Sequence, residues 1–292
     1  MGDHQRIICK GGQEMNGGLV RLREVYDSLN PSERKVAAFI LQEPAEMIQM
    51  SVADLAVRSG SSQAAIVRLC KTMGFKGYQD LKLKVAGDLQ EPLATGYQDI
   101  RPNDSISAII QNVSNNNIQS IRDTMKIMEE GKVEEAVLAL DQSKRIFMFG
   151  VGASNLIGMD AQQKFLRINK VCISFPDPHV QLTSAVLLTP DDTAVCISYS
   201  GETDEVIRAA AIAREKGCKT IGITKYGDST LSRSVDIPLY TSSTENEIRS
   251  GAMSSRITQL NLIDILYLGV ASRNYENSVK YLDESRQAIK RL

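Results

Sequence analysis

The sequence predicts a two-domain α/β protein, in which an all-α N-terminal bundle precedes a three-layer α/β domain built on a five-stranded parallel sheet. Three observations predict this class. Short capped helical segments separated by glycine turns occupy residues 19–90. Apolar strand-like runs alternate with helical patterns from residue 145 onward, which is the order of a parallel sheet with right-handed crossovers. A chain of 292 residues with 42% apolar side chains can form two hydrophobic cores.

Composition places the boundaries between these parts. The first residues are rich in glycine and polar side chains, so we expect a disordered tail. Met15 is the more natural first residue of the sequence that folds. Pro92, Gly96 and Pro102 indicate a linker between the two domains. The expected parts are the tail (1–18), the helix-turn-helix domain (19–90), the linker (91–104) and the α/β domain with flanking helices (105–292).

The N-terminal domain begins with a helix that has clear start and stop signals. Asn30 or Ser32 can cap it, and Pro31 suits its first turn. Apolar residues at helical spacing run to Leu41, and Pro44 closes the helix.

Two further helices have the pattern of a helix-turn-helix. The first, residues 51–58, begins with a capping box from Ser51 to Asp54. A tight turn at Gly60 follows, and residues 62–73 form a second helix that opens with small polar residues. A short helix, a glycine turn and a second helix of this kind are typical of DNA-binding domains.

Positive charge is concentrated around the second of these helices. The whole chain is nearly neutral, with 34 basic and 35 acidic side chains. Between Arg58 and Lys84, however, there are six cations and one anion, Asp80. This concentration suits contacts with DNA phosphates. The alternative is a helical bundle with an ordinary solvated basic face.

Residues at the start of the second helix are the expected DNA contacts. Gln63 is the best candidate for reading a base, because its carboxamide can bond adenine in a bidentate way. Arg68 either contacts DNA or braces the helix through a carboxylate in the same bundle. The expected DNA-binding residues are Ser61, Ser62, Gln63, Ala64, Arg68, Lys71 and Lys76.

The α/β domain is expected to contain five strands. Its strand-like runs are residues 145–149, 171–174, 194–197, 220–224 and 235–239. Its expected helices are residues 105–129, 133–140, 156–168, 204–216 and 246–270.

The turn after the third strand, residues 198–203, is the most informative segment of the chain. It carries the hydroxyls of Ser198, Ser200 and Thr203, and Gly201 lets the backbone approach a ligand closely. The free N–H groups and the positive dipole end of the following helix favour an anion here. Such residues also simply cap helices, which is the alternative interpretation of this turn alone.

A second turn of the same kind follows the first strand. Gly150 and Gly152 give half of a dinucleotide fingerprint, but position 155 is Asn, and no acidic residue ends the next strand. A nicotinamide cofactor is therefore not expected, and the hydroxyl of Ser154 remains at the helix start. Two such turns converge at the carboxyl edge of a parallel sheet, where a small phosphorylated molecule would bind.

Together the two turns resemble those of the sugar isomerase (SIS) domain, a phosphosugar-binding module. The resemblance covers about residues 130–275. It implies that hydroxyls and backbone groups of both turns hold the sugar phosphate, and that Glu247, near the start of a long helix, occupies the place of a catalytic base in related isomerases. The expected ligand-binding residues are Gly152, Ser154, Ser198, Tyr199, Ser200, Gly201, Thr203, Glu247 and His179.

The catalytic set of an isomerase looks incomplete. Aldose–ketose isomerisation needs a glutamate and a second proton carrier. The chain has two histidines, His4 in the tail and His179 after the second strand. His179 is expected to contact a ligand or start a helix. Glu247 can accept a hydrogen bond from a sugar hydroxyl or form an ion pair with Arg249 or Arg256. No residue is therefore expected to be catalytic, and a site that binds a phosphosugar without converting it is a sensor.

From residue 19 onward, nearly the whole chain resembles the RpiR-type bacterial transcription regulators, and among them the MurR-like members. The family pattern is recognisable in residues 30–35, 66–71, 73–78 and 249–256. Ala65 stands where threonine is usual, and Ser61 where valine is usual, which affects the detailed DNA contacts.

The resemblance implies a DNA-binding regulator, a repressor by expectation. Its effector would be N-acetylmuramic acid 6-phosphate or a related amino-sugar phosphate. Its partners would be operator DNA and further copies of the same chain, in a homodimer or homotetramer. One alternative is a phosphosugar isomerase or etherase with a helical accessory domain. Another is a sugar-phosphate-binding subunit that regulates a protein partner.

Composition agrees with a cytoplasmic protein. The five cysteines are scattered without C-x-x-C pairing, so reduced thiols are expected and a metal site is not. No apolar run approaches the roughly 20 residues of a membrane span, and no signal peptide opens the chain. No cofactor is expected.

Overall fold

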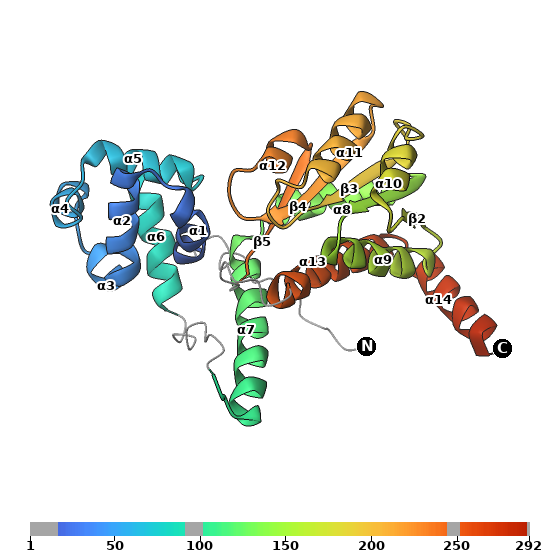
Figure 1. Ribbon diagram of the computed structural model, residues 1–292, viewed down its shortest axis with the longest axis horizontal. Coiled ribbons are helices and arrows are strands. Elements are labelled where there is room, and N and C mark those ends of the chain that lie inside the picture. Colours follow the sequence, from blue (N-terminus) through green and yellow to red (C-terminus); the bar gives the residue numbers. More distant parts are fainter. Residues whose placement is uncertain (1–16, 91–101, 244–251, 291–292) are drawn as a thin grey trace, which may run out of the picture. The chain divides into compact units, whose positions relative to one another are not determined.

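The computed structural model describes residues 17–90, 102–243 and 252–290 (Figure 1). Its contacts divide the chain into two compact units between Gly96 and Tyr97. This division falls inside the expected linker, of which residues 91–101 lie outside the described residues, as do residues 1–16 of the expected tail.

The N-terminal unit is helical throughout its described residues. Asn30 caps the second helix by accepting a hydrogen bond from the Glu33 amide, with Pro31 in its first turn. Ser51 and Asp54 form both halves of the predicted capping box. The elements are α1 (Gly18–Val25), a 3-10 turn (Tyr26–Ser28), α2 (Pro31–Gln42), α3 (Pro44–Met47), α4 (Val52–Arg58), α5 (Gln63–Thr72) and α6 (Tyr78–Leu89). The helix-turn-helix prediction is confirmed, with α4 and α5 as its two helices.

Apolar faces of these helices form one core. The side chains without solvent exposure include Leu22, Ile40, Leu55, Ile66, Leu69 and Leu81. Helix α1 begins at Gly18, inside the expected tail, because the Asp88 carboxylate accepts hydrogen bonds from the amides of Gly17 (2.7 Å) and Leu19 (2.8 Å). A Cβ at Gly18 would lie 3.0 Å from the Lys84 Cβ, so glycine allows the close packing of α1 on α6.

The C-terminal unit contains the predicted five-stranded parallel sheet. The strands are β1 (Arg145–Gly150), β2 (Val171–Ser174), β3 (Thr193–Ile197), β4 (Lys219–Lys225) and β5 (Ile237–Thr241), in the order β2-β1-β3-β4-β5. The helices are α7 (Ile106–Ile127), α8 (Glu130–Gln142), α9 (Ala153–Leu166), α10 (Pro178–Ala185), α11 (Asp204–Glu215), α12 (Thr230–Ser234), α13 (Met253–Arg273) and α14 (Tyr275–Lys290). Figure 1 shows α9 and α13 on the opposite side of the strands from α11 and α12.

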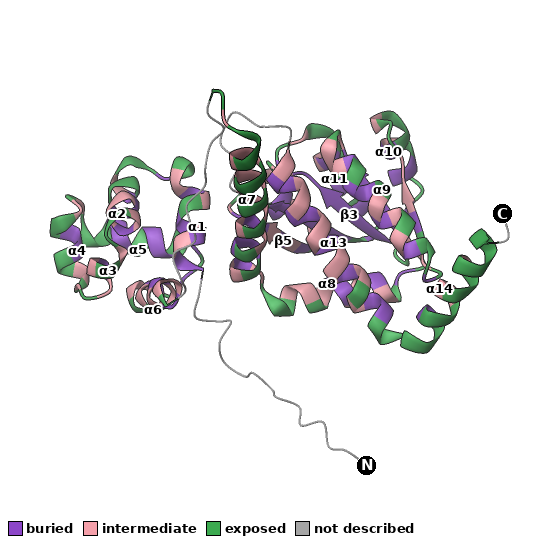
Figure 2. Cartoon of the chain, turned by 90° about the horizontal axis from the view of Figure 1, so that it is seen from below, coloured by how far each residue is buried: buried purple, intermediate pink, exposed green. Residues whose placement is uncertain are grey.

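Side-chain alternation along the strands produces the three layers. In β1, Ile146 and Met148 pack with α8, α9 and α13, whereas Phe147 and Phe149 pack with α10, α11 and α12. Both faces are therefore apolar, as a parallel sheet covered by helices requires. Figure 2 shows the buried strands enclosed by helices whose outward faces are exposed.

Several element boundaries differ from the sequence prediction, among them the starts of β5 and α13. Strand β5 begins at Ile237 rather than at residue 235, because the Asp236 carboxylate accepts hydrogen bonds from the amide and hydroxyl of Thr220 (2.8 and 2.9 Å) before the ladder starts. Helix α13 begins at Met253, after Ala252 in a left-handed conformation. The predicted start at residue 246 lies outside the described residues. Helices α10, α12 and α14 were not among the predicted helices.

Candidate functional site

The two predicted turns meet at the carboxyl edge of neighbouring strands. Gly150, the last residue of β1, pairs with Ile197, the last residue of β3. A cavity of about 100 Å³ lies where the two turns adjoin. It is lined by Val151, Ala153, Ser154, Tyr199, Ser200, Thr203, Ala252, Ser255, Arg256 and Gln259. The structure thus brings together the predicted ligand contacts Ser154, Tyr199, Ser200 and Thr203.

The turn after β1 is held by one buried glutamine. Gln181 of α10 accepts a hydrogen bond from the Gly150 amide (3.1 Å) and donates to the carbonyls of Gly150 (2.8 Å) and Phe175 (2.7 Å). Gly152 has a positive φ of 59° and precedes α9, which no side chain caps. The amides of Ser154 and Asn155 donate to the carbonyls of Val151 (3.2 Å) and Gly152 (3.0 Å), so it is the positive dipole end of α9 that favours an anion beside Ser154.

The turn after β3 is ordered by its own hydroxyls. Ser198 is 2% exposed, and its Oγ lies 2.7 Å from the Thr203 Oγ1 and accepts from the Gly201 amide at 3.1 Å. Ser200 Oγ accepts from the Glu202 amide at 3.2 Å. Ser198 was predicted as a ligand contact, but it does not line the cavity. Its buried hydroxyl instead orients Thr203, which does line it.

An acidic side chain of this turn is directed to another helix. The Glu202 carboxylate accepts a hydrogen bond from the Thr230 amide (2.8 Å) at the start of α12. This hydrogen bond lowers the pKa of Glu202, so its charge is stabilised there. Glu202 does not line the cavity, and its carboxylate is occupied at a separate helix N-terminus.

Gly201 is required for both conformation and space. Its φ is +71°, and a Cβ there would overlap the Ser229 Oγ and lie 2.5 Å from the Ser229 Cβ. Gly152 has a similar φ of +59° but no atom within 4 Å of a built Cβ. Substitution at Gly152 therefore tests backbone strain alone, whereas substitution at Gly201 tests strain together with steric overlap.

We expect Gly201→Ala to destabilise the C-terminal unit more than Gly152→Ala. Both variants incur a positive-φ penalty of about 1–3 kcal/mol, and Gly201→Ala adds about 1–3 kcal/mol of overpacking. Urea unfolding followed by circular dichroism measures the difference. Equal losses in the two variants would mean that the turn adjusts around Ser229 without cost.

Helix α13 supplies a wall of the cavity that the sequence prediction missed. Arg256 and Gln259 lie one turn apart on this helix and both line the cavity, as does the buried Ser255. Arg256 forms no ion pair with any described residue. The only sequence signal was the familiar block at residues 249–256, which includes Arg256 but gives no distance to the two turns.

Three other predicted ligand residues, Gly152, Gly201 and His179, do not line this cavity. His179 is exposed in the first turn of α10 and does not line the cavity. Its role as a helix-start residue agrees with this position. Glu247 lies outside the described residues.

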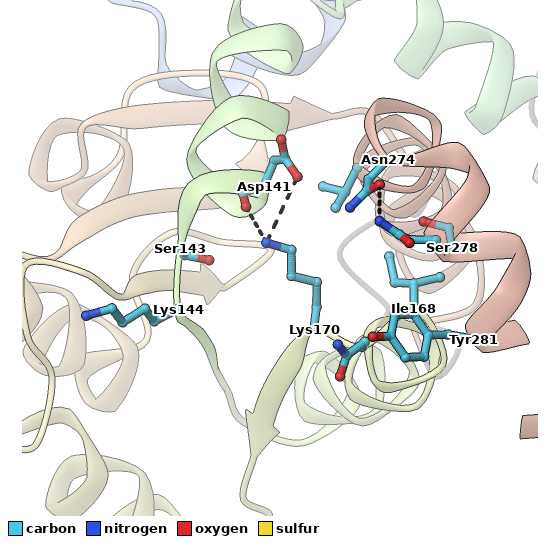
Figure 3. A pocket seen from close by; sticks show the side chains of 11 residues that line it. Asp141, Ser143, Lys144, Ile168, Lys170, Asn274, Ser278 and Tyr281 are labelled. Atoms are coloured by element: carbon cyan, nitrogen blue, oxygen red, sulfur yellow. Dashed lines mark hydrogen bonds and ion pairs between the residues drawn. The ribbon is translucent and has the colours of Figure 1, made fainter. Parts of the chain in front are cut away.

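A larger cavity of about 390 Å³ lies near the amino ends of β1 and β2. Figure 3 shows the Lys170 side chain directed at Asp141. The Asp141 carboxylate also pairs with Arg273 at 3.1 Å, and Lys144 pairs with Asp191 at 2.6 Å. Its cations are thus paired with carboxylates. Open α/β sheets bind ligands at the carboxyl edge, so the cavity beside Ser200 and Thr203 is the stronger candidate.

In the N-terminal unit, α5 presents the expected DNA-contacting residues at its start. Ser62 caps the helix by accepting from the Ala65 amide at 3.2 Å. Gln63, Ala64 and Lys71 are exposed, and so is Val67, which the prediction did not include. Lys76, in the turn that follows, is also exposed.

Two of the predicted DNA contacts also brace the bundle. Arg68 Nε lies 3.3 Å from Oε1 of the buried Glu33, while its side chain remains 52% exposed. The Ser61 hydroxyl donates to the Ser32 carbonyl at 2.9 Å. The bracing alternative for Arg68 is therefore present, and both residues hold α5 against α2.

Within the described ranges, neither a metal site nor a membrane span is found. No cluster of potential ligands is present there, and none of the described helices combines the length and hydropathy of a membrane-crossing segment. The described cysteines are buried and free. Burial raises the pKa of Cys70 to about 11 and that of Cys172 to about 12, so both thiols are protonated near neutral pH. Cys9 lies outside the described residues.

Comparison with known proteins now identifies the family. A helix-turn-helix domain of the rpiR family matches residues 16–92, and an SIS domain matches residues 139–269. The HTH-type transcriptional regulator YbbH of Bacillus subtilis is 42% identical over 94% of this chain and 98% of its own length. The chain belongs to the RpiR family.

A second relative and a solved structure extend the comparison. HexR, an HTH-type transcriptional regulator of Pseudomonas aeruginosa, is 34% identical over 94% of this chain and 96% of its own. The structure of Vibrio vulnificus NanR complexed with ManNAc-6P has a TM-score of 0.59 and 29% identity, and it covers 93% of this chain and 97% of its own. This RpiR-family chain is thus a transcriptional regulator with an SIS domain.

Proposed function

We propose that this regulator senses an amino-sugar phosphate in its SIS domain and represses transcription by binding operator DNA through α5. One observation carries the proposal. Ser154, Ser200, Thr203 and Arg256, which has no ion pair among the described residues, line one cavity between the starts of α9 and α11. Hydroxyl donors, helix N-termini and a guanidinium are the groups that bind phosphate.

The cavity volume suits the phosphate end of a ligand. Pockets that enclose a whole drug-sized molecule measure about 300–1,000 Å³, whereas this cavity measures about 100 Å³. Vibrio vulnificus NanR, similar over most of the chain, was solved with ManNAc-6P. This likeness supports an amino-sugar phosphate, for which N-acetylmuramic acid 6-phosphate and N-acetylmannosamine 6-phosphate are the candidates.

Regulation would follow from linkage between two binding events. The phosphosugar favours one arrangement of a homodimer or homotetramer, and operator DNA favours one arrangement of its helix-turn-helix pair. The coupling must be reciprocal and is typically about 1–3 kcal/mol, or about 5- to 150-fold in affinity.

Fluorescence anisotropy with labelled operator DNA tests this function. The fragment is first found by footprinting on the promoter regions beside the coding sequence. We expect saturating phosphosugar to weaken DNA binding by about 5- to 150-fold. Absence of any footprint would favour the alternative in which the chain regulates a protein partner. A footprint that no phosphosugar alters would contradict the sensing proposal.

The enzyme alternative is tested by turnover. We expect the purified protein to leave glucosamine 6-phosphate, fructose 6-phosphate and N-acetylmuramic acid 6-phosphate unchanged over hours, as followed by NMR. Glu247→Gln is then expected to alter phosphosugar affinity alone, because the negative charge is lost and one acceptor oxygen becomes an amide donor. Turnover in the parent protein that disappears in Glu247→Gln would establish an isomerase or etherase instead.

A further inference from the structure

Gln259 is a buried side-chain amide on the wall of the cavity beside Ser200 and Thr203. It is 2% exposed, lies on α13 and lines the cavity. Its Nε2 has no hydrogen-bond partner in the described part of the chain. Leaving a buried donor unpaired is unfavourable, so a hydrogen-bond acceptor inside the cavity would stabilise it.

The neighbouring side chains do not meet this need. The Thr258 hydroxyl donates to the Ser255 carbonyl at 3.0 Å, and no hydrogen bond joins it to the Gln259 amide. Arg256, three residues before Gln259, lies on the same face of α13, and it has no acceptor group to offer. Among the described residues, Arg256 has no ion-pair partner and Gln259 Nε2 has no hydrogen-bond partner, so both side chains can meet a ligand in the cavity that they line.

The two side chains differ in the ligand groups that they suit. A guanidinium only donates, which matches the acceptor oxygens of a phosphate. A carboxamide both donates and accepts, which matches a sugar hydroxyl or an N-acetyl group. Phosphate alone would leave the accepting atom of Gln259 unused, whereas a polar sugar substituent can use both of its functions.

We propose that Gln259 is a specificity-determining residue that hydrogen-bonds a hydroxyl or N-acetyl group of the sugar, while Ser200, Thr203 and Arg256 hold its phosphate. The inference rests on the proposed phosphosugar function and deepens it. A site built to hydrogen-bond a polar group rejects ligands that lack the group, because its buried amide then stays unpaired. Gln259 would thus separate a sugar phosphate from inorganic phosphate.

Calorimetry on the full chain tests this assignment with two probes, N-acetylmannosamine 6-phosphate and inorganic phosphate. Gln259→Met keeps the length of the side chain and removes its hydrogen bonds, and Gln259→Leu is a second variant of the same kind. We expect both to weaken sugar-phosphate binding by about 5- to 150-fold and to leave phosphate binding unchanged. Arg256→Gln, the matched control on the same helix face, is expected to weaken both probes.

The possible results separate this inference from the function beneath it. The melting temperature of Gln259→Met without ligand should not be lower than that of the parent protein, because an unpaired amide adds no stability. Unchanged sugar-phosphate affinity in both Gln259 variants would mean that the amide binds a structural water only, and would overturn the inference alone. Equal losses for both probes would overturn it too, by making Gln259 a phosphate contact. Parent protein that binds neither probe, nor N-acetylmuramic acid 6-phosphate, would refute the phosphosugar function itself.

Discussion

Replacing Ser200 and Thr203 together with alanine is expected to abolish stabilisation of the protein by a phosphosugar. Both hydroxyls line the cavity at the start of α11, where they can donate to a phosphate. Hydrogen bonds to charged groups contribute about 1.5–3 kcal/mol each, so the double variant should lose at least about 100-fold in affinity. At a ligand concentration of 100 Kd for the parent, stabilisation would fall from about 2.7 to about 0.4 kcal/mol.

The fold itself should survive this double substitution. The variant removes the contacts of Ser200 with the Glu202 amide and of Thr203 with Ser198, each worth about 1 kcal/mol. Thermal melting with and without N-acetylmannosamine 6-phosphate measures both effects. Ser107→Ala with Ser114→Ala, which removes two exposed hydroxyls of α7, serves as the control and should keep the full response. An unchanged ligand response in the Ser200/Thr203 variant would show that the phosphate binds elsewhere.

The sequence was sufficient for the parts of this site that depend on local order. A strand, a glycine-containing hydroxyl turn and a helix follow one another within about 20 residues, and parallel strands bring their carboxyl ends to one edge. Ser154 and Ser200 could therefore be expected side by side. The same reasoning predicted the helix-turn-helix, because capping residues such as Ser51 and Ser62 act within one turn of their own helix.

The parts that the sequence could not provide depend on contacts between distant segments. Gln259 reaches the cavity from α13, some 100 residues after Ser154, and nothing in its neighbourhood marks it as a ligand contact. The hydroxyl pattern in the sequence could not predict that Ser198 is buried and hydrogen-bonded to Thr203. The shift of β5 has the same origin, since Asp236 bonds Thr220 of a neighbouring strand.

On the DNA side, the bracing of Arg68 illustrates the same limit. The sequence allowed either a DNA contact or an ion pair with an unspecified carboxylate. The structure identifies this carboxylate as Glu33, on a helix 35 residues away. Because Arg68 holds α5 in place, its substitution would mix a folding effect with a DNA effect. Lys71 and Gln63 are better probes, since no hydrogen bond or ion pair of their side chains is present among the described residues.

Lys71→Ala is expected to weaken binding to every DNA sequence and to flatten its salt dependence. Each phosphate contact contributes about −0.9 to the slope of log K against log salt. A dimer that loses one contact per subunit should therefore show a slope smaller in magnitude by nearly two. Anisotropy titrations over a range of salt concentrations measure this slope on operator and random DNA. Lys216→Ala removes an exposed cation at the end of α11 in the other unit and should leave the slope unchanged. An unaltered slope in Lys71→Ala would remove this lysine from the phosphate contacts.

Gln63→Ala should instead change base preference at one position in each half-site. The first turn of a recognition helix meets base edges, where a glutamine carboxamide bonded to adenine discriminates by about 1–3 kcal/mol. Val67, exposed one turn after Gln63, can add an apolar contact with a thymine methyl beside that adenine. Affinities for operators substituted one base pair at a time locate the position that loses its preference. Because phosphate contacts cannot distinguish sequences, an equal loss on every operator would reassign Gln63 to the DNA backbone and leave base reading to other residues of α5.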